Sequence, residues 1–155
     1  MGRVDALIKV LKQAGVVGLD TMVFVYAFER HPDHGPLAQA IFRAMEGGLF
    51  RGCASVLALG EVLTGVKKAQ APELLLRYRD VFQRFPGLTL ADAGTVVMER
   101  MSDLRARYNI PTPDAIHLGT ALVHGAGAFV TNDVRLRRVA EIEVLVLADF
   151  VSDGN

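Results

Sequence analysis

The sequence predicts an α/β protein in which a parallel sheet of about five strands is covered by helices on both faces. Two observations lead to this expectation. Short runs of β-branched and apolar residues alternate along the chain with longer segments of helical periodicity, which is typical of βαβ units. Hydrophobic residues also make up 51% of the sequence and the mean hydropathy is +0.29, as expected of strands that are buried on both faces.

A single domain accounts for the whole sequence. A chain of 155 residues can bury a sizeable core, and no repeat or low-complexity linker marks a boundary, so we expect one domain over residues 1–155. The 17 basic and 17 acidic residues give a formal net charge of zero, which excludes a positive electrostatic potential over the whole surface. Any nucleic acid would therefore bind a local patch.

The first part of the sequence predicts a helix, a strand and a second helix in succession. Apolar residues over Val4–Leu11 recur at helical spacing, and Gly15 ends this extra N-terminal helix, which we expect within residues 1–15. The β-branched run in Val16–Asp20 predicts a buried strand. A short helix over Val23–Phe28 follows.

The middle of the sequence continues the alternation after a loop at His31–Pro36, which is rich in residues that break regular structure. Periodicity predicts a helix over Leu37–Met45 and an apolar run predicts a strand over Phe50–Ser55, whose last residue can cap the next helix. Leu59, Val62, Leu63 and Val66 form the apolar face of that helix, and Glu61 lies beside it. Pro72–Phe85 forms another helix, because proline suits a first helical turn.

The last part of the sequence predicts three strands and two long helices. In order, the expected elements are a strand at Leu88–Ala91, a helix capped by Asp92 and running through Tyr108, a helix with Thr112 as N-cap and running to Gly125, strands at Ala128–Thr131 and Val144–Leu147, and a tail over 149–155. The expected inward positions of the helix after Asp92 are Val96, Val97, Met101 and Leu104.

Four acidic residues stand at the ends of these elements. Asp20 ends the first strand, Glu61 lies in the first turns of the helix after the second strand, Asp114 lies at a helix start, and Asp133 follows the fourth strand. Such positions share one edge of a parallel sheet, so we expect the four carboxylates to lie together. Each acid alone also suits a helix start or a solvated helix face. Their joint occurrence at equivalent places favours a functional site.

Carboxylates that lie close together need a positive partner, because like charges raise one another's pKa. A hard divalent cation removes this repulsion, and oxygen-only ligands suit Mg²⁺ or Mn²⁺. Zinc would favour histidine or thiolate ligands, which this set lacks. The sequence therefore predicts Mg²⁺ or Mn²⁺ chemistry, for which hydrolysis of a phosphodiester is a suitable reaction.

The motifs around the four acids read, in order, LDTMVFVYAFE, ASVLALGEVLTG, TPDAIHLGTAL and FVTNDVRLRRV. This set resembles PIN-domain ribonucleases, in particular the VapC-type toxins of type II toxin–antitoxin modules, over nearly the whole chain. The resemblance implies an α/β/α sandwich, Mg²⁺- or Mn²⁺-dependent hydrolysis of RNA, a homodimer, and a small antitoxin that blocks the site. It also implies that Asp20, Glu61, Asp114 and Asp133 are the acidic metal-site residues and that Thr131 orients the last acid or a water.

Two features depart from the pattern of that family. Met22 stands where a small polar residue such as Asn or Ser is usual, which removes a possible hydrogen bond near Asp20. The expected helix within residues 1–15 precedes the strand with which many members begin, so the resemblance assigns it no role.

Several further residues have two interpretations each. His117, three residues after Asp114, could contact that acid or the substrate, or be a hydrogen-bonded structural histidine. His31 and His34 could bind a transition metal, although a surface turn suits them better. A short basic helix is expected over Val134–Val139. Its three arginines could bind phosphates or form a solvated face: Arg135, Arg137 and Arg138.

The remaining predictions concern the cellular compartment and the partners. Cys53 is the only cysteine, which excludes an intrachain disulfide and fits a packed thiol in a reducing cytoplasm. No apolar run is long enough to span a bilayer, so no membrane partner is expected.

Two kinds of protein compete with a toxin nuclease. A PIN-like protein could process RNA without a toxin role, or bind without catalysis, although the presence of all four acids disfavours the latter. A Mg²⁺-dependent phosphoacceptor or phosphatase domain also uses strand-end aspartates. It would favour a second acid near Asp20, where this chain has Thr21 and Met22.

Overall fold

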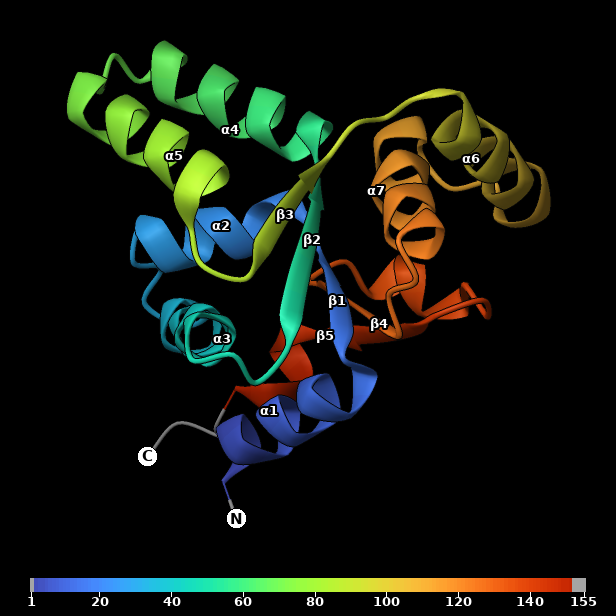
Figure 1. Ribbon diagram of the computed structural model, residues 1–155, viewed down its shortest axis with the longest axis horizontal. Coiled ribbons are helices and arrows are strands. Elements are labelled where there is room, and N and C mark those ends of the chain that lie inside the picture. Colours follow the sequence, from blue (N-terminus) through green and yellow to red (C-terminus); the bar gives the residue numbers. More distant parts are fainter. Residues whose placement is uncertain (1, 152–155) are drawn as a thin grey trace.

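Five parallel strands form the middle layer of the computed structural model, which describes residues 2–151 (Figure 1). The strand order is β3-β2-β1-β4-β5, and every neighbouring pair is parallel, as the sequence predicts. The strands are β1 (Val16–Leu19), β2 (Arg51–Ser55), β3 (Leu88–Ala91), β4 (Ala128–Thr131) and β5 (Glu143–Val146). Because β1 lies between β2 and β4, the carboxyl end of β1 is the point at which strand order reverses, where open α/β sheets bind ligands.

Helices cover both faces of this sheet. In Figure 1, α2 to α5 lie on one side of the strands, α6 and α7 lie on the other, and α1 lies below. The helices are α1 (Arg3–Ala14), α2 (Thr21–Phe28), α3 (Gly35–Glu46), α4 (Val56–Lys68), α5 (Pro72–Arg84), α6 (Thr95–Tyr108) and α7 (Thr112–Val123), with 3-10 turns η1 (Val134–Arg138) and η2 (Leu147–Phe150). The expected α/β/α sandwich is therefore confirmed.

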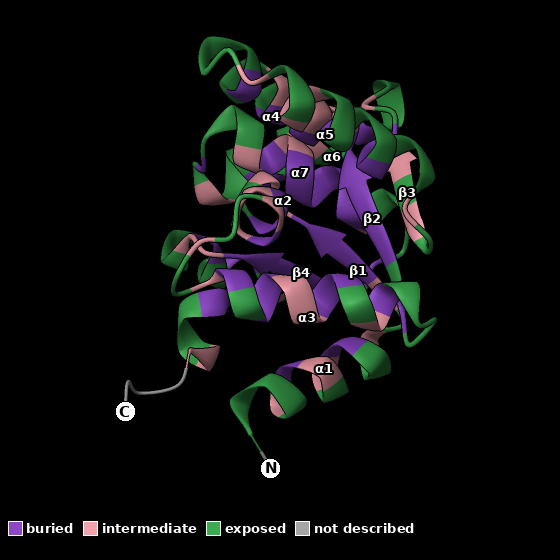
Figure 2. Cartoon of the chain, turned by 90° about the vertical axis from the view of Figure 1, so that its left-hand side faces the viewer, coloured by how far each residue is buried: buried purple, intermediate pink, exposed green. Residues whose placement is uncertain are grey.

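Each face of the sheet has its own hydrophobic core. Val17 and Val130 pack with Phe24 and other residues of the first five helices, whereas Phe129, the neighbour of Val130 in β4, packs with Leu118 of α7. This alternation follows from the pleat, which directs successive side chains to opposite faces. Figure 2 shows the buried residues along the strands and along the helix faces that are turned toward them.

The approach of α7 to the sheet depends on a glycine in β1. A Cβ added to Gly18 would lie 2.6 Å from the Cβ of Ala121 and 2.8 Å from a ring carbon of Phe129. Only glycine allows the helix and the strand to approach so closely. The first turn of α7 is thereby held near the carboxyl end of β1.

The start of α6 differs from the sequence prediction. Asp92 does not cap this helix, because the chain first crosses in extended form from β3 to the other face of the sheet (Figure 1). Gly94 takes the N-cap position, and Val96, expected to point inward, is 67% exposed. Similarly, Thr112 is the first residue of α7 and Pro111 precedes it in the N-cap position.

The two ends of the described chain extend the core. Leu7 and Leu11 of α1 are fully buried, so the N-terminal helix belongs to the fold. The expected basic helix at Val134–Val139 is the 3-10 turn η1, and η2 occupies the start of the predicted tail. The remainder of that tail, residues 152–155, lies outside the described residues.

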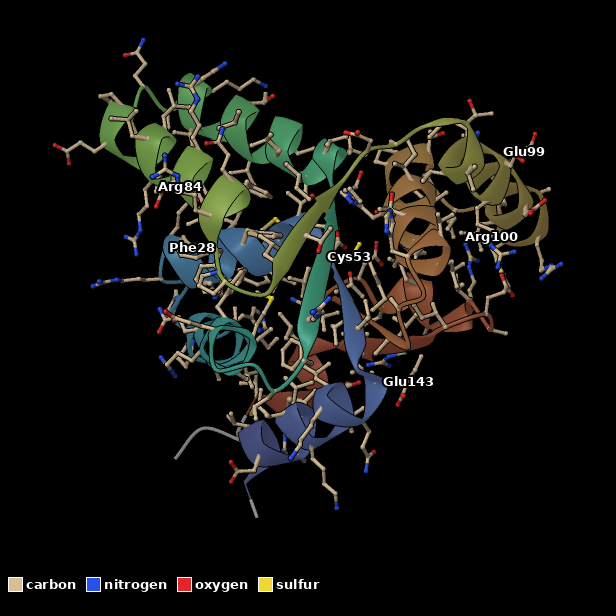
Figure 3. The ribbon with its side chains drawn as sticks, in the orientation of Figure 1. Phe28, Cys53, Arg84, Glu99, Arg100 and Glu143 are labelled. Carbon is tan, nitrogen blue, oxygen red and sulfur yellow. The ribbon has the colours of Figure 1, made fainter. Side chains whose placement is uncertain are left out.

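Two further predictions concern Cys53 and the bilayer. Cys53 lies in the buried part of β2 (Figure 3), and its burial raises the pKa of the thiol to about 11. A packed thiol is therefore confirmed. None of the helices in residues 2–151 combines the length and the apolar character needed to cross a membrane.

Candidate active site at the acidic edge of the sheet

Asp20 lies directly after β1, at the centre of the sheet edge. One carboxylate oxygen, Oδ1, accepts the backbone N–H of Thr21 at 2.8 Å and so caps α2. The other, Oδ2, accepts a hydrogen bond from the Thr131 hydroxyl at 2.7 Å. Asp20 therefore caps a helix, as one interpretation of the sequence predicts, and it also faces Thr131 of β4.

Thr131 is a fully buried link between two of the acids. Its hydroxyl donates to Asp20 and accepts the backbone N–H of Asp133 at 3.1 Å. The end of β4 is thereby tied to the end of β1. This is the geometry by which a hydroxyl at this position can orient the last acid.

Asp114 lies in the first turn of α7, and the pKa of its carboxyl is raised. Burial is the largest cause, followed by the negative charges of Asp20 and then of Asp133. The carboxylates of Asp20 and Asp133 therefore lie close enough to Asp114 to destabilise its charged form.

Glu61 joins this edge through Thr21 and His117. Its Oε1 accepts a hydrogen bond from the Thr21 hydroxyl at 2.9 Å and lies 2.7 Å from His117 Nε2. His117 is buried, with its Nε2 3.1 Å from the Thr21 hydroxyl and 3.9 Å from Asp20 Oδ1. Sequence reasoning missed Thr21, although its place directly after Asp20 is a signal that could have found it.

Asp133 is held by Arg135 of the following turn. The Arg135 backbone N–H and Nε both lie 3.0 Å from Oδ1, and Nη2 lies 2.7 Å from Oδ2. These hydrogen bonds are the largest cause of the lowered pKa of the Asp133 carboxyl. Unlike the contacts of Asp20, they come from a side chain that is 64% exposed.

The other two arginines of η1 differ in their partners. Arg137 pairs with Asp149 of η2 at 2.5 Å, so its guanidinium is engaged away from the acids. Arg138 lies close enough to Asp133 for its charge to contribute to the lowered pKa of that acid. Of the three arginines that could bind phosphates, Arg135 and Arg138 therefore place positive charge near Asp133.

Asn132 is a second residue that sequence reasoning missed, since the sequence indicates only a turn there. Its Oδ1 accepts the backbone N–H of Ala148 at 3.0 Å, and its Nδ2 lies 3.3 Å from the Tyr26 hydroxyl and 3.2 Å from His34 Nε2. Asn132 thus fixes the turn between Thr131 and Asp133 to three other segments.

His31 and His34 pack against Tyr26, and their rings are arranged for this packing. Their rings stack at a centroid distance of 5.0 Å, and Tyr26 lies 4.9 Å from each. His31 Nδ1 accepts the backbone N–H of His34 at 3.1 Å, as expected of a surface turn. The turn interpretation is therefore confirmed.

Residues 17–142 match the family model of the PIN domain. The chain belongs to the PIN-domain family. PIN domains are nucleases, so the membership supports an activity on nucleic acid. The four acids all fall within the matched residues.

Solved structures of toxin–antitoxin complexes share the fold of this PIN domain. It is similar to a chain of VapBC2 from Rickettsia felis bound to a DNA fragment from their promoter, with a TM-score of 0.68, 21% identity, and coverage of 84% of this chain and 98% of that chain. For DNA-bound VapBC from Salmonella typhimurium the values are 0.66, 23%, 85% and 97%. For a toxin–antitoxin complex from Klebsiella pneumoniae they are 0.65, 21%, 85% and 97%. No curated protein sequence matches the chain.

The donor set of this PIN domain fits a hard divalent cation. The four acids offer only oxygen. Burial, and then the negative charges of Asp20 and Asp133, raise the pKa of the Asp114 carboxyl, and a cation would offset that charge repulsion. In their present orientations, however, no three His, Cys, Asp or Glu side chains within residues 2–151 are arranged to hold a metal ion. Glu61 faces Thr21 and His117, and Asp133 faces Arg135. A shared cation would therefore require Asp133 to leave Arg135.

A separate hollow of about 380 Å³ lies between α2, α3 and α5. Phe28, at the end of α2 far from the sheet (Figure 3), lines it, and the Arg77 guanidinium lies 5.4 Å from the centre of the Phe28 ring. None of the four acids lines this hollow. The candidate active site is therefore distinct from it.

Proposed function

We propose that this PIN domain is a Mg²⁺- or Mn²⁺-dependent endoribonuclease that hydrolyses phosphodiester bonds of RNA. The observation that carries the proposal is the electrostatic coupling of Asp20, Asp114 and Asp133 at the switch point of the sheet. Such a concentration of carboxylates opposes the binding of RNA unless a cation compensates for it. A phosphoacceptor domain fits less well, because Thr21 and Met22 stand where it would favour another acid.

The proposed roles follow from the contacts. Asp20, Asp114 and Asp133 would hold the first Mg²⁺ or Mn²⁺, and Glu61 would assist or bind a second. When bound, such an ion supplies a Lewis acid that stabilises the developing charge on the phosphate and lowers the pKa of the attacking water. Thr131 keeps Asp20 and the backbone of Asp133 in fixed register.

The basic residues would orient the RNA. Once Asp133 binds a cation, the Arg135 guanidinium is released and can donate to a phosphate oxygen of the substrate. Arg138 adds positive charge at the same turn. These contacts would place the scissile phosphate in line with the attacking water, which is the geometry that hydrolysis requires.

The partners are also part of the proposal. The structural neighbours are toxin–antitoxin complexes, and this likeness supports a small antitoxin that covers the acidic edge, and a toxin role. We further propose a homodimer that acts in the cytoplasm.

Cleavage of a labelled RNA in Mg²⁺ or Mn²⁺ tests the activity. Wild-type protein is expected to cleave, EDTA to stop cleavage, and Asp20→Asn to lose it, because the amide has no charge for a cation but keeps the oxygen that caps α2. Asp80→Asn is the matched control, since Asp80 lies on α5 and pairs only with Arg84 at 3.6 Å among the ion pairs of the described chain. An Asp20→Asn variant that cuts as well as wild type would contradict the metal site.

Growth of cells that express the chain tests the toxin role. Expression should arrest growth, and co-expression of a small protein encoded directly beside this gene should relieve the arrest. Cleavage without growth arrest would instead support an RNA-processing nuclease. The Asp20→Asn variant controls for a general burden of expression.

A further inference from the structure

His117 is a buried histidine whose two ring nitrogens meet different surroundings. Only 3% of the residue is exposed. Nε2 faces three oxygen atoms, at 2.7 Å in Glu61, 3.1 Å in Thr21 and 3.9 Å in Asp20. Nδ1 is buried and has no hydrogen-bond partner among the described residues.

These surroundings determine which nitrogen of His117 carries hydrogen. The carboxylates of Glu61 and Asp20 can only accept, and the Thr21 hydroxyl already donates its hydrogen to Glu61 Oε1, so each oxygen faces Nε2 as an acceptor. Nε2 must therefore be the donor. A hydrogen on Nδ1 would be a buried N–H without an acceptor, which costs free energy.

The same contacts divide the two oxygens of Glu61 into different roles. Oε1 accepts from both Thr21, at 2.9 Å, and His117, at 2.7 Å. No side chain or backbone group within residues 2–151 donates a hydrogen bond to Oε2. The carboxylate is thus fixed by one oxygen while the other stays available.

We propose that His117, in its Nε2–H form, is a positioning residue that acts with Thr21 to saturate Oε1 of Glu61, so that Oε2 is the oxygen presented to a divalent cation. The inference deepens the proposed function and rests on it for the nature of the ligand. The physical basis is preorganisation, because a glutamate side chain otherwise samples many rotamers, whereas a buried ring and a hydroxyl at a helix start hold it in one. Hydrogen-bond partners of ligating carboxylates commonly have this task.

The tautomer can be measured without metal or RNA. Two-dimensional ¹H–¹⁵N NMR of the histidine rings should show Nδ1 of His117 unprotonated and Nε2 protonated, with the signal assigned by its loss in His117→Gln. The chain has four histidines, so this assignment is tractable. A signal that shows hydrogen on Nδ1 and none on Nε2 overturns the inference.

Two substitutions then separate a donor at Nε2 from simple filling of the core. The glutamine amide nitrogen lies about as far from the backbone as Nε2, whereas the asparagine amide nitrogen lies about as far as Nδ1. His117→Gln should therefore retain Mn²⁺ affinity close to that of wild type, and His117→Asn should lose about 10- to 100-fold. Mn²⁺ alone is the probe, titrated into RNA-free protein and followed by electron paramagnetic resonance.

The matched control is His124→Gln at the far end of α7, where the ring lies outside the acidic edge. It should leave Mn²⁺ affinity unchanged, and thermal unfolding of every variant shows whether the fold persists. Equal Mn²⁺ affinities of His117→Gln and His117→Asn would overturn the inference, as would a wild-type protein that binds no Mn²⁺. If wild type binds Mn²⁺ with the expected ranking but cuts no RNA, the proposed function fails while the positioning role stands.

Discussion

The acidic edge has an inner half and an outer half that are held in different ways. In the inner half, Asp20 and Glu61 accept hydrogen bonds from buried side chains of other elements, Thr131 at 0% and His117 at 3% exposure. In the outer half, Asp133 is held by the exposed Arg135, two residues further along the same turn. The inner half is therefore fixed by tertiary packing, and the outer half by a local ion pair that solvent screens.

This difference indicates which part of the site is preformed and which part can adapt. Removing the Thr131 hydroxyl leaves an oxygen of the largely buried Asp20 carboxylate without its donor, whereas removing Arg135 exposes Asp133 to water. We therefore expect loss of an inner donor to affect both the fold and the activity, and loss of the outer Arg135 to affect mainly ligand binding.

Thr131→Val should have the largest effect. The variant removes the donor to Asp20 Oδ2 and the acceptor for the Asp133 backbone N–H, so we expect a loss of about 1–3 kcal/mol in the free energy of unfolding. RNA cleavage should fall by at least about tenfold. Urea unfolding and cleavage assays measure the two effects. Thr131→Ser keeps the hydroxyl and should restore most of both, and a Val variant as stable and active as wild type would refute the fixed inner half.

Asp114→Asn should have the next largest effect, which is on the pH dependence of stability. The folded-state pKa of Asp114 is raised, so this residue contributes stability that is fully present below its unfolded pKa and is lost as the pH rises through the raised value. The contribution of Asp114 to the stability of metal-free protein should thus increase as the pH falls through this interval. Asp114→Asn should stabilise metal-free protein at neutral pH by at most about 1 kcal/mol, since solvent screens a half-buried group. Urea unfolding in EDTA across the acidic range measures this.

Asp133 supplies the contrasting control for that experiment. Its pKa is lowered, chiefly by Arg135, so its contribution to stability is present above the unfolded pKa and is lost as the pH falls through the lowered value. Asp133→Asn should therefore change the pH profile in the opposite direction. If the two asparagine variants shift the profile in the same direction, the pKa values of Asp114 and Asp133 are not displaced in opposite directions as described.

Arg135→Ala should have a smaller effect, confined to ligands. The variant frees Asp133, so affinity for Mn²⁺ without RNA should rise modestly, whereas the KM for RNA should increase because a phosphate contact is lost. The melting temperature should hardly change. Arg100→Ala on α6, a helix that carries none of the four acids (Figure 3), is the control. A weakened Mn²⁺ affinity in Arg135→Ala would show that this arginine does not compete with the cation.

Arg137→Ala should have the smallest effect. This arginine pairs with Asp149 on the surface, where such pairs contribute little, so cleavage and Mn²⁺ affinity should match those of wild type. The same RNA assay measures it. A large increase in KM would place Arg137 in the substrate path after all.

The sequence predicted the sheet and the acidic edge because both depend on local patterns. Alternating strand and helix signals determine the layers, and strand ends such as Asp20 and Asp133 necessarily lie at one edge of a parallel sheet. The predicted start of α6 was wrong, because the number of residues that cross from β3 to this helix depends on the distance between the layers. Asp92 could cap a helix by its chemistry, but not from a crossing segment.

The contacts within the site could not be predicted in the same way. Glu61 and His117 are 56 residues apart, and their meeting depends on how α4 and α7 pack against the end of α2. Asn132 is similar, because its partners lie in α2, in the turn before α3, and at η2. A sequence shows which groups reach an edge, but packing determines which donor serves which oxygen.

Gly18 has a consequence for chemistry that takes place two residues further along the strand. A methyl group there would lie 2.6 Å from the Cβ of Ala121, so α7 would have to tilt away from the sheet to make room for it. The first turn of that helix would then carry Asp114 away from Asp20, and the two carboxylates would separate although every charged residue was still present. The spacing of the reactive groups is thus set by the smallest side chain in the strand below them.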